Sequence, residues 1–320
     1  MTLNKIIAVT VAAPLVFGAA AAFAEYPEKP IKLIIPYRAG GGSDSLARTM
    51  QAAIEKHKLL PVPLVITNIT GAAGAVAARR VKDAKPDGYT ILQIHNGIMA
   101  IAATGRLGFG LDVFAPVAQT TQSCIYLAVP STQPWQTFED LVKYAKANPG
   151  KLKAADSVGG ITHFSWIQLM KVTGTKVGIV HYGGTSKRFA SMKGGHTQAA
   201  FMSPGWIKRG ADQLRGLLWL GPKRHAAAPN MPTAKEKGID VVSCLNRRFW
   251  MPKGTPAARV GYFAGLLKKA MATDEMKAYH KKRLGSIVLR TGDDLKKDIA
   301  AEMQNFNNAA PVVKAAMGKK

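Results

Sequence analysis

Near the start of the chain, an apolar segment, a glycine-rich turn and a helical pattern follow one another directly. Residues 31–35 are mostly apolar and predict a buried strand. Three consecutive glycines follow at residues 40–42. Apolar residues then recur at the spacing of a helix, at Leu46, Ala47, Met50 and Ile54. We expect Ser43 or Asp44 to cap this helix.

A glycine turn between a strand and a helix suits an anionic ligand. Glycine lets the backbone come close to a ligand, and the first N–H groups of the helix then point at that ligand. The alternative is a tight turn in which the glycines only supply positive φ angles. This turn alone leaves both interpretations open, and recurrence of the same unit favours the ligand.

The same unit recurs within the first hundred residues. A second strand at 64–67 leads through the small-residue turn 68–74 into a helix at 75–82, and a third strand at 89–94 ends at residues 95–97. Repeated units of this kind predict a parallel sheet covered by helices. Ligands of such sheets bind at the carboxyl ends of the strands, where these turns lie.

A second α/β module follows a long apolar strand expected at 124–129. Its helices and strands are expected at 137–147, with Thr137 and Asp140 as a capping box, then at 153–155, 162–173, 177–180, 185–192, 199–202 and 217–220. The last part predicts a strand at 241–245, helices at 257–272 and 273–284, a strand at 286–289 and a helix at 293–309. These closing helices must pack on one of the two modules.

The first 24 residues predict a secretory signal peptide. Lys5 supplies a positive start, residues 6–17 an apolar stretch, and residues 22–24 (Ala-Phe-Ala) a small-residue cleavage signature. A transmembrane anchor is the alternative, but the strongly apolar part is short. The protein is therefore expected to be exported.

The chain is strongly basic. Lys and Arg number 44 and Asp and Glu 19, which gives a formal net charge of +25. Such a surplus suits nucleic acid, an anionic membrane surface or an acidic small molecule. The basic residues are scattered and not interleaved with stacking aromatics, so no nucleic-acid groove is expected and most of them form a solvated face.

Metal, cofactor and catalytic signatures are missing from the sequence. Cys124 and Cys244 are the only cysteines, and no Cys/His spacing suits a metal. After export the two cysteines can pair, or they can be two separate buried thiols. No G-x-S-x-G, H-E-x-x-H or P-loop occurs, and Ser157 and His163 do not form a nucleophile–base arrangement. We expect no metal, no cofactor and no enzymatic activity.

Several phrases together resemble one family. They are residues 26–48, Pro-Asp-Gly-Tyr-Thr at 86–90, Asp-Val-Phe-Ala-Pro-Val at 112–117, Tyr-Gly-Gly at 182–184, Met-Pro-Thr at 231–233 and Pro-Lys-Gly-Thr-Pro at 252–256. In order and spacing they resemble the Bug or TctC-type solute-binding receptors of tripartite tricarboxylate transporters, over about residues 25–309.

The resemblance implies a periplasmic monomer with a type II periplasmic binding-protein fold, a Venus-flytrap clamshell of two α/β domains. Domain 1 would comprise residues 25–123 and 246–320, and domain 2 residues 124–245. Two hinge strands would join them near 122–129 and 240–248. Cys124 and Cys244 would lie on these crossing strands, and we therefore expect a disulfide between them.

The resemblance also implies a function and a ligand site. A mono-, di- or tricarboxylate, which can be aromatic, would be captured between the domains and delivered to a membrane permease. The contacts would come from backbone N–H groups and hydroxyls at helix starts. Mapped onto this chain, they are Ala39, Gly40, Gly41, Ser43, Asp44, Ser157, Gly160, Thr162, His163, Gly184, Thr185 and Ser186.

Four side chains carry alternatives from their own chemistry. His163 is a candidate donor to a carboxylate at a helix start, with a capping or packing histidine as the alternative. Arg247 is a candidate to grip a second carboxylate bidentately, with a surface arginine as the alternative, and Arg248 would face the other way. Asn96 is a candidate polar contact or a strand-end turn residue. Asp44 would repel an anion, so it is better interpreted as a helix cap or a holder of bound water.

The chain departs from the family pattern twice. Residues 194–202 lack two acids that relatives usually carry, and residues 246–250 (Asn-Arg-Arg-Phe-Trp) replace a Trp-x-Gly phrase. Both changes make the expected site more positive, so the ligand cannot be copied from relatives. The alternative function is an exported basic protein that binds polyanions or surfaces without a small-molecule cleft, and its binding would fall steeply with salt.

Overall fold

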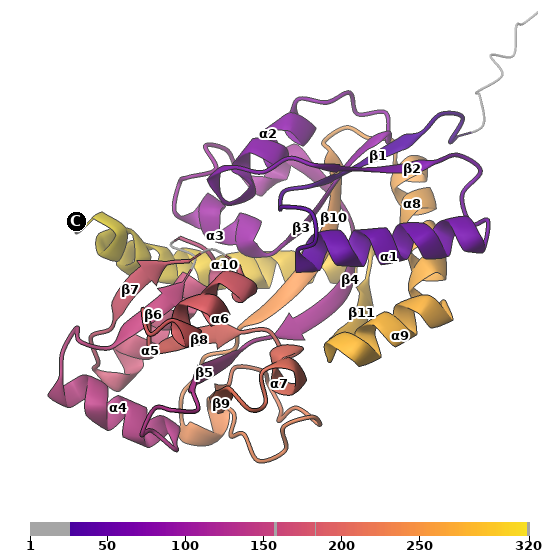
Figure 1. Cartoon of the computed structure of the whole chain (residues 1–320). Helices are drawn as coiled ribbons and strands as arrows, with labels where there is room; N and C mark the ends of the chain where they lie inside the picture. The colour runs from indigo at the N-terminus through magenta and orange to yellow at the C-terminus, as the bar shows by residue number, and fades with distance from the viewer. Residues whose placement is uncertain (1–25, 157–158, 183, 319–320) are drawn as a thin grey trace, which may run out of the picture.

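The computed structural model describes residues 26–156, 159–182 and 184–318 and builds two mixed β-sheets covered by helices. In Figure 1 the first sheet lies at the upper right and the second at the lower left. The expected signal peptide and Ser157 lie outside the described residues. Within the described ranges, no helix combines the length and the apolar character that a membrane span requires.

The first sheet has six strands in the order β11-β4-β10-β3-β1-β2. They are β1 (Ile31–Ile35), β2 (Leu64–Asn68), β3 (Thr90–His95), β4 (Phe114–Cys124), β10 (Cys244–Pro252) and β11 (Ser286–Arg290). Strand β1 pairs in parallel with β2 and β3, as the repeated units predict, whereas β10 runs antiparallel between β3 and β4.

Helices cover both faces of this sheet. One core contains α1 (Gly42–Lys56), α8 (Ala257–Met271) and α9 (Asp274–Arg283). The core on the other face contains α2 (Ala75–Lys82), α3 (Gly97–Ala103) and α10 (Gly292–Gly318). Short 3₁₀ turns occur at Ala72–Gly74 and Leu111–Val113.

The second sheet has five strands in the order β7-β6-β8-β5-β9. They are β5 (Tyr126–Pro130), β6 (Lys153–Asp156), β7 (Gly178–His181), β8 (Ala199–Met202) and β9 (Leu214–Trp219). The helices of this lobe are α4 (Phe138–Ala147), α5 (Ile161–Thr173), α6 (Thr185–Lys193) and α7 (Trp206–Arg209), with a 3₁₀ turn at Lys235–Lys237. Thr137 and Asp140 form the expected capping box of α4.

The chain crosses between the sheets at two adjacent places. The strand expected over 124–129 is broken at Ile125, whose N–H donates to Ser243 O while its carbonyl accepts from Leu220 N. This change of partners separates β4 from β5. Residues 241–243 were expected in a strand, but β10 begins only at Cys244. Cys124 and Cys244 are paired in the β4–β10 register and form a disulfide.

The ends of several helices differ from the sequence-based expectation. Helix α3 was not predicted, because its short apolar stretch directly follows a strand. Helix α10 continues past Pro311 to Gly318 instead of ending near residue 309. The extension is packed against the protein, since Ala310 and Val313 are buried. Ahead of it, Phe306 meets Phe164 of α5 edge to face.

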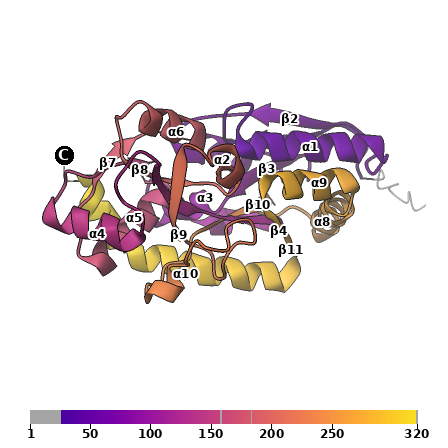
Figure 2. The same ribbon diagram turned by 60° about the horizontal axis from the view of Figure 1, so that its bottom comes forward.

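Helix α10 links the two lobes. It contacts α3 and β4 of the first lobe and α5 of the second. Figure 2 shows it running along one side of the molecule beneath both lobes. The position of α10 is therefore coupled to the strands that cross between the sheets.

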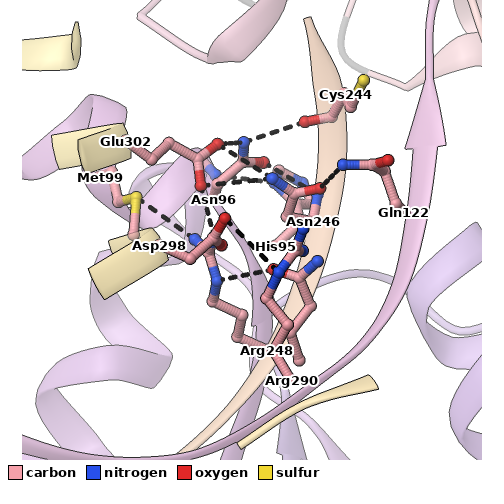
Figure 3. Close-up of polar contacts among 12 residues, drawn as sticks. His95, Asn96, Met99, Gln122, Cys244, Asn246, Arg248, Arg290, Asp298 and Glu302 are labelled. Atoms are coloured by element: carbon pink, nitrogen blue, oxygen red, sulfur yellow. Dashed lines mark hydrogen bonds and ion pairs between the residues drawn. The ribbon is translucent and has the colours of Figure 1, made fainter. Parts of the chain in front are cut away.

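A buried ionic network attaches α10 to β10 (Figure 3). Arg248 is 1% exposed, and its Nη2 lies 2.5 Å from Asp298 Oδ2 and 2.6 Å from Glu302 Oε2, both on α10. Its Nε donates to Gln119 Oε1 of β4 at 3.1 Å. Glu302 also accepts from Asn96 and Asn246. Each charge in this network is thus paired and hydrogen-bonded.

We expect Arg248→Met to destabilise the oxidised protein by about 3 kcal/mol or more, because it leaves two partly buried carboxylates without their cation. The measurement is equilibrium urea unfolding. Arg224 is the matched control, since its pair with Glu236 is 48% and 44% exposed. Arg224→Met should cost less than about 1 kcal/mol. Equal losses in the two variants would contradict the structural role of Arg248.

Candidate functional site

Three helices at the expected site, α1, α5 and α6, begin without a side-chain cap and each follow a strand. Helix α1 follows β1, α5 follows β6 and α6 follows β7. Their N-cap residues are Gly41, Gly160 and Gly184, and none of these helices has a side-chain hydrogen bond at its cap. The first N–H groups of a helix have no partner within the helix. These three helix starts therefore present unpaired donors, unlike α4.

The expected cap of α1 was wrong. Gly41 is the N-cap, so Ser43 and Asp44 lie inside the first turn. Asp44 is buried, and its carboxylate accepts from Gly40 N at 2.8 Å and from Arg48 and Asn68 at 2.9–3.1 Å. Burial raises the pKa of Asp44, but hydrogen bonds from Arg48, Asn68 and Gly40 outweigh it and hold the pKa below its usual value. Asp44 thus stays ionised and accepts the hydrogen bond of the Gly40 N–H, which is then not available to a ligand.

Positive φ explains only some of the glycines at these turns. Gly40 has φ +76° and needs to be glycine for that reason. Gly41 and Gly184 have φ −70° and −76°, which any residue can adopt. No heavy atom lies within 4 Å of the place where a Cβ of Gly184 would be. A missing side chain here keeps the helix start accessible, and this favours the ligand interpretation.

Tyr37 and His95 form a donor pair at the ends of β1 and β3. His95 Nδ1 accepts from Gly97 N at 2.9 Å, which places the proton of the neutral ring on Nε2. Nε2 lies 2.7 Å from Tyr37 Oη and donates to it. Burial raises the pKa of Tyr37, so its hydroxyl keeps its proton and can donate it to a further acceptor.

The sequence interpretation did not single out Tyr37 or His95 as site residues. The signal that could have found them is their position, because Tyr37 follows shortly after β1 and His95 ends β3. A polar aromatic side chain at the carboxyl end of a buried parallel strand faces the edge where ligands of such sheets bind.

Arg247 lies beside this pair. It is the register partner of His95 on β3 and of Thr121 on β4. Its Nε donates to Ser43 Oγ over a long 3.4 Å, and a Cβ at Gly42 would lie 3.3 Å from its Nη2. Burial lowers the pKa of its guanidinium. Arg247 therefore brings a cation to the start of α1.

Helix α9 holds the start of α1 from the other side. Tyr279 Oη donates to Gly42 O at 3.2 Å, and Arg283 donates to Ser45 Oγ at 3.0 Å. The exposed Ala39 lies in the same turn, ahead of Gly40. The start of α1 is thus fixed by side chains of α9 and β10.

In the second lobe, a buried network joins the starts of α5 and α6. Thr162 Oγ1 donates to Asp156 and accepts from Arg188 Nη2 at 3.2 Å. Arg188 also donates to Phe201 O of β8 at 3.0 Å. The hydroxyl of Thr162 is consequently engaged inside the protein, and the network orients both helix starts.

The remaining residues of the expected set have different surroundings. His163 is buried, and its Nδ1 accepts from Gly159 N at 2.8 Å; burial, with a smaller contribution from Arg106, lowers its pKa although Asp156 opposes this. Thr185 is half-buried and Ser186 exposed in the first turn of α6. Both residues directly follow the N-cap Gly184.

Asn96 is not brought to this site. Its amide donates to Cys244 O at 2.9 Å and to Glu302, and its Oδ1 accepts from Asn246 N at 3.3 Å. These partners lie on the face of the sheet that packs on α10, away from His95. The side chain therefore takes part in the network of Figure 3.

The two lobes approach each other at the site residues. Arg188 of α6 and Arg247 of β10 both lie near enough to His95 to lower its pKa, in addition to the larger effect of burial, to about 3. His225 of the second lobe also lies 3.1 Å from the carbonyl of Leu284, after α9. The junction is rich in positive charge and in N–H donors.

A cavity lies elsewhere in the first lobe. It has a volume of about 700 Å³ and lies between α3, the segment 105–116 and α10. Apolar side chains, including Phe109, Trp250 and Met303, form most of its lining. It lacks the converging donors that an anion needs, so we place the candidate site at the helix starts. Among the described residues, no group of His, Cys, Asp and Glu side chains suits a metal ion.

The pKa of His95 predicts a pH-dependent stability. In the folded protein the pKa of His95 is about 3, below its ordinary value of 6.5, so the unfolded chain binds a proton that the folded protein does not. The contribution of His95 to the free energy of unfolding is therefore fully present above pH 6.5 and is lost as the pH falls towards 3. The loss from this one residue approaches about 1.4 kcal/mol per pH unit.

The comparison of His95→Gln with the wild type by urea unfolding between pH 7 and 5 measures this contribution. The variant should lose less stability on acidification. The exposed His196 supplies the control, and His196→Gln should follow the wild type. A wild-type slope in the His95 variant would show that His95 is protonated in the folded protein.

Comparisons with known proteins agree with this geometry. The chain is 32% identical over 253 residues to the UPF0065 protein in the gbd 5′ region of Cupriavidus necator, which covers 77% of this chain and 76% of that protein. A protein of Rhodopseudomonas palustris solved with adipate has a TM-score of 0.80 at 24% identity, covering 90% of this chain and 98% of the other. MatC of the same organism, with bound malate, has a TM-score of 0.79 at 22% identity, covering 89% and 100%.

These likenesses confirm the two-lobed fold of periplasmic binding proteins. The family model described as the tripartite tricarboxylate transporter family receptor matches residues 46–309. The chain therefore belongs to the TctC family of tripartite tricarboxylate transporter receptors.

Proposed function

We propose that this protein captures a small carboxylate between its two lobes in the periplasm and delivers it to a membrane permease. The observation that carries the proposal is the set of three uncapped helix starts at Gly41, Gly160 and Gly184. Each of these three helix starts has glycine as its N-cap, whereas α4 is capped by the side chains of Thr137 and Asp140.

Backbone donors at helix starts suit a carboxylate for two physical reasons. Each helix start carries a partial positive charge, and an anion there is favoured by roughly 0.3–1 kcal/mol and by more when partly buried. The N–H groups are also fixed before the ligand arrives, so little conformational entropy is lost on binding. The ligand would close the lobes by binding the closed state more tightly.

The side chains around these donors support an anion. The Tyr37 hydroxyl is kept protonated, and Arg247 and Arg188 surround His95 with positive charge. The one acid in the first turn of α1, Asp44, is paired with Arg48. The structural relatives solved with malate and with adipate were bound to small carboxylates, which agrees with the same class of ligand.

In this proposal the protein is a receptor without catalytic turnover. It is exported and acts as a monomer. The family it belongs to is one of transport receptors. Its proposed ligand contacts are mostly backbone groups of α1, α5 and α6, which bind an anion but neither abstract protons nor attack a carbonyl. Export rests on the signature in residues 1–24.

A panel of carboxylates in thermal unfolding tests the ligand class. A true ligand at about a hundred times its dissociation constant should stabilise the protein by about 2.7 kcal/mol. Mass spectrometry of molecules released from the purified protein supplies the first compounds for the panel, and neutral sugars of similar size are the control. If sugars stabilise the protein and no acid does, the proposal is wrong.

The same experiment addresses polyanion binding. Binding of a carboxylate buried between lobes should change little between low and high salt, because buried charges are weakly screened. Binding of a polyanion to the basic surface should fall steeply with salt. A steep dependence without any small-acid binding would favour the basic surface as the functional feature.

A substitution at Gly184 separates stability from binding. Asp is as good a helix cap as any residue, so Gly184→Asp should keep or raise the stability by a few tenths of a kcal/mol. Its carboxylate would occupy the start of α6 and repel the ligand. We expect the affinity for the acid to fall at least about tenfold, equal to about 1.4 kcal/mol.

Gly184→Asn is the matched control, because Asn caps equally well without charge. Titration calorimetry should show a smaller loss for Asn than for Asp. If both variants bind like the wild type, the start of α6 does not contact the ligand.

A further inference from the structure

A buried histidine of α9 has no hydrogen-bond partner. His280 is 7% exposed, and neither of its ring nitrogens is bonded to any described residue. Its Nδ1 would lie 3.3 Å from a Cβ at Gly285, in the turn between α9 and β11. Burial, and a smaller contribution from the nearby Arg247, lower its pKa to about 4. The ring is therefore neutral, with one donor and one acceptor unused.

Other unpaired polar groups lie on the same face of the first sheet. Thr121 is the register partner of Arg247, and its buried hydroxyl has no partner among the described residues. Gln93 precedes His95 by two positions on β3, which places it on the same face, and both polar atoms of its amide are buried and unpaired. Leaving such groups unpaired costs stability.

Arg247 is the charged member of this group. Its Nε donates a long hydrogen bond of 3.4 Å to Ser43 Oγ. No carboxylate of the described residues forms an ion pair with Arg247. Its counterpart on the opposite face, Arg248, is held by two carboxylates. The two adjacent arginines therefore differ: Arg248 is paired with carboxylates, and Arg247 has no anionic partner among the described residues.

We propose that Arg247 and His280 form a second anion subsite, and that the ligand is a dicarboxylate. This inference rests on the proposed function. One carboxylate would lie at the helix starts, and the other between α1 and α9. Arg247 would donate two N–H groups to it, and His280 would donate one. Thr121 and Gln93 would complete the polar lining.

The charges around His280 are consistent with a second carboxylate. Arg247 faces it from β10, Tyr279 lies next to it on α9, and Arg283 follows one turn later. Tyr279 and Arg283 are already bound to the first turns of α1. By contrast, the ring nitrogens of His280 have no partner, and Arg247 has only the long bond to Ser43.

The test compares a dicarboxylate with the monocarboxylate of equal length in which a methyl group replaces one carboxylate. Titration calorimetry on the full mature protein should give at least a hundredfold preference for the diacid. Arg247→Met should remove most of this preference, because it should weaken the diacid about a hundredfold and the monoacid much less. Arg247→Lys should recover part of it. Lys281→Met, exposed on the same helix, is the control.

His280→Leu distinguishes a binding role from a structural one. Replacing an unpartnered buried ring with an apolar residue should leave the melting temperature of the ligand-free protein unchanged or higher, while diacid affinity falls about tenfold. A lower melting temperature with equal loss for both ligands would mean that His280 only packs.

The outcomes separate the two proposals. If no acid binds the wild type, the proposed function itself fails. If acids bind but the diacid and the monoacid bind equally, the receptor function stands and the second subsite is wrong. If the Arg247→Met variant keeps the full preference for the diacid, the unpaired groups are satisfied by water and not by the ligand, and the inference is overturned.

Discussion

The adjacent crossing of two strands is the constraint on which the other features of this protein depend. Strands β4 and β10 pair along their length, and the Cys124–Cys244 disulfide closes this pairing at the end where the chain passes into the second lobe. Because side chains alternate along a strand, β10 presents Arg247 to one face of the sheet and Arg248 to the other. The first faces the helix starts, and the second is bound to α10 by Asp298 and Glu302.

The two faces of the first sheet therefore differ in how their polar groups are paired. On the α10 face each buried charge is paired, and the network joins the crossing strands to a helix that also packs on the second lobe. On the α1 face the donors outnumber their partners. Paired charges hold the crossing strands to this helix, whereas a cluster of unsatisfied groups costs stability unless a ligand or water completes it. The face packed on α10 thus holds the strands whose other face, towards α1, carries the proposed ligand contacts.

Preparation before binding is the common feature of the site. Tyr37 is oriented by His95, the start of α1 is held by Tyr279 and Arg283, and the starts of α5 and α6 are joined through Asp156, Thr162 and Arg188. Few of these groups need to move when an anion arrives. The loss of entropy on binding is therefore small, and affinity can come from a few well-placed donors.

The sequence alone determined the local units. Apolar runs followed by glycine turns predicted β1, β2, β3, β6, β7 and β8 and the helices after most of them, because these patterns depend on neighbours within a few residues. The sequence also predicted that Arg247 and Arg248 point to opposite faces of their strand. The pattern also indicated two α/β modules, and the family resemblance supplied the hinge strands and the cysteine pair.

Only the tertiary structure decided which groups are free. Asp44, Gly40, Thr162 and Asn96 resemble ligand contacts in the sequence, yet their partners are residues far along the chain or on neighbouring elements. Conversely, nothing local to His280 shows that it is buried without a partner beside a residue 33 positions away. Hydrogen-bond satisfaction is a property of the whole fold, since a donor is free only if no other segment reaches it.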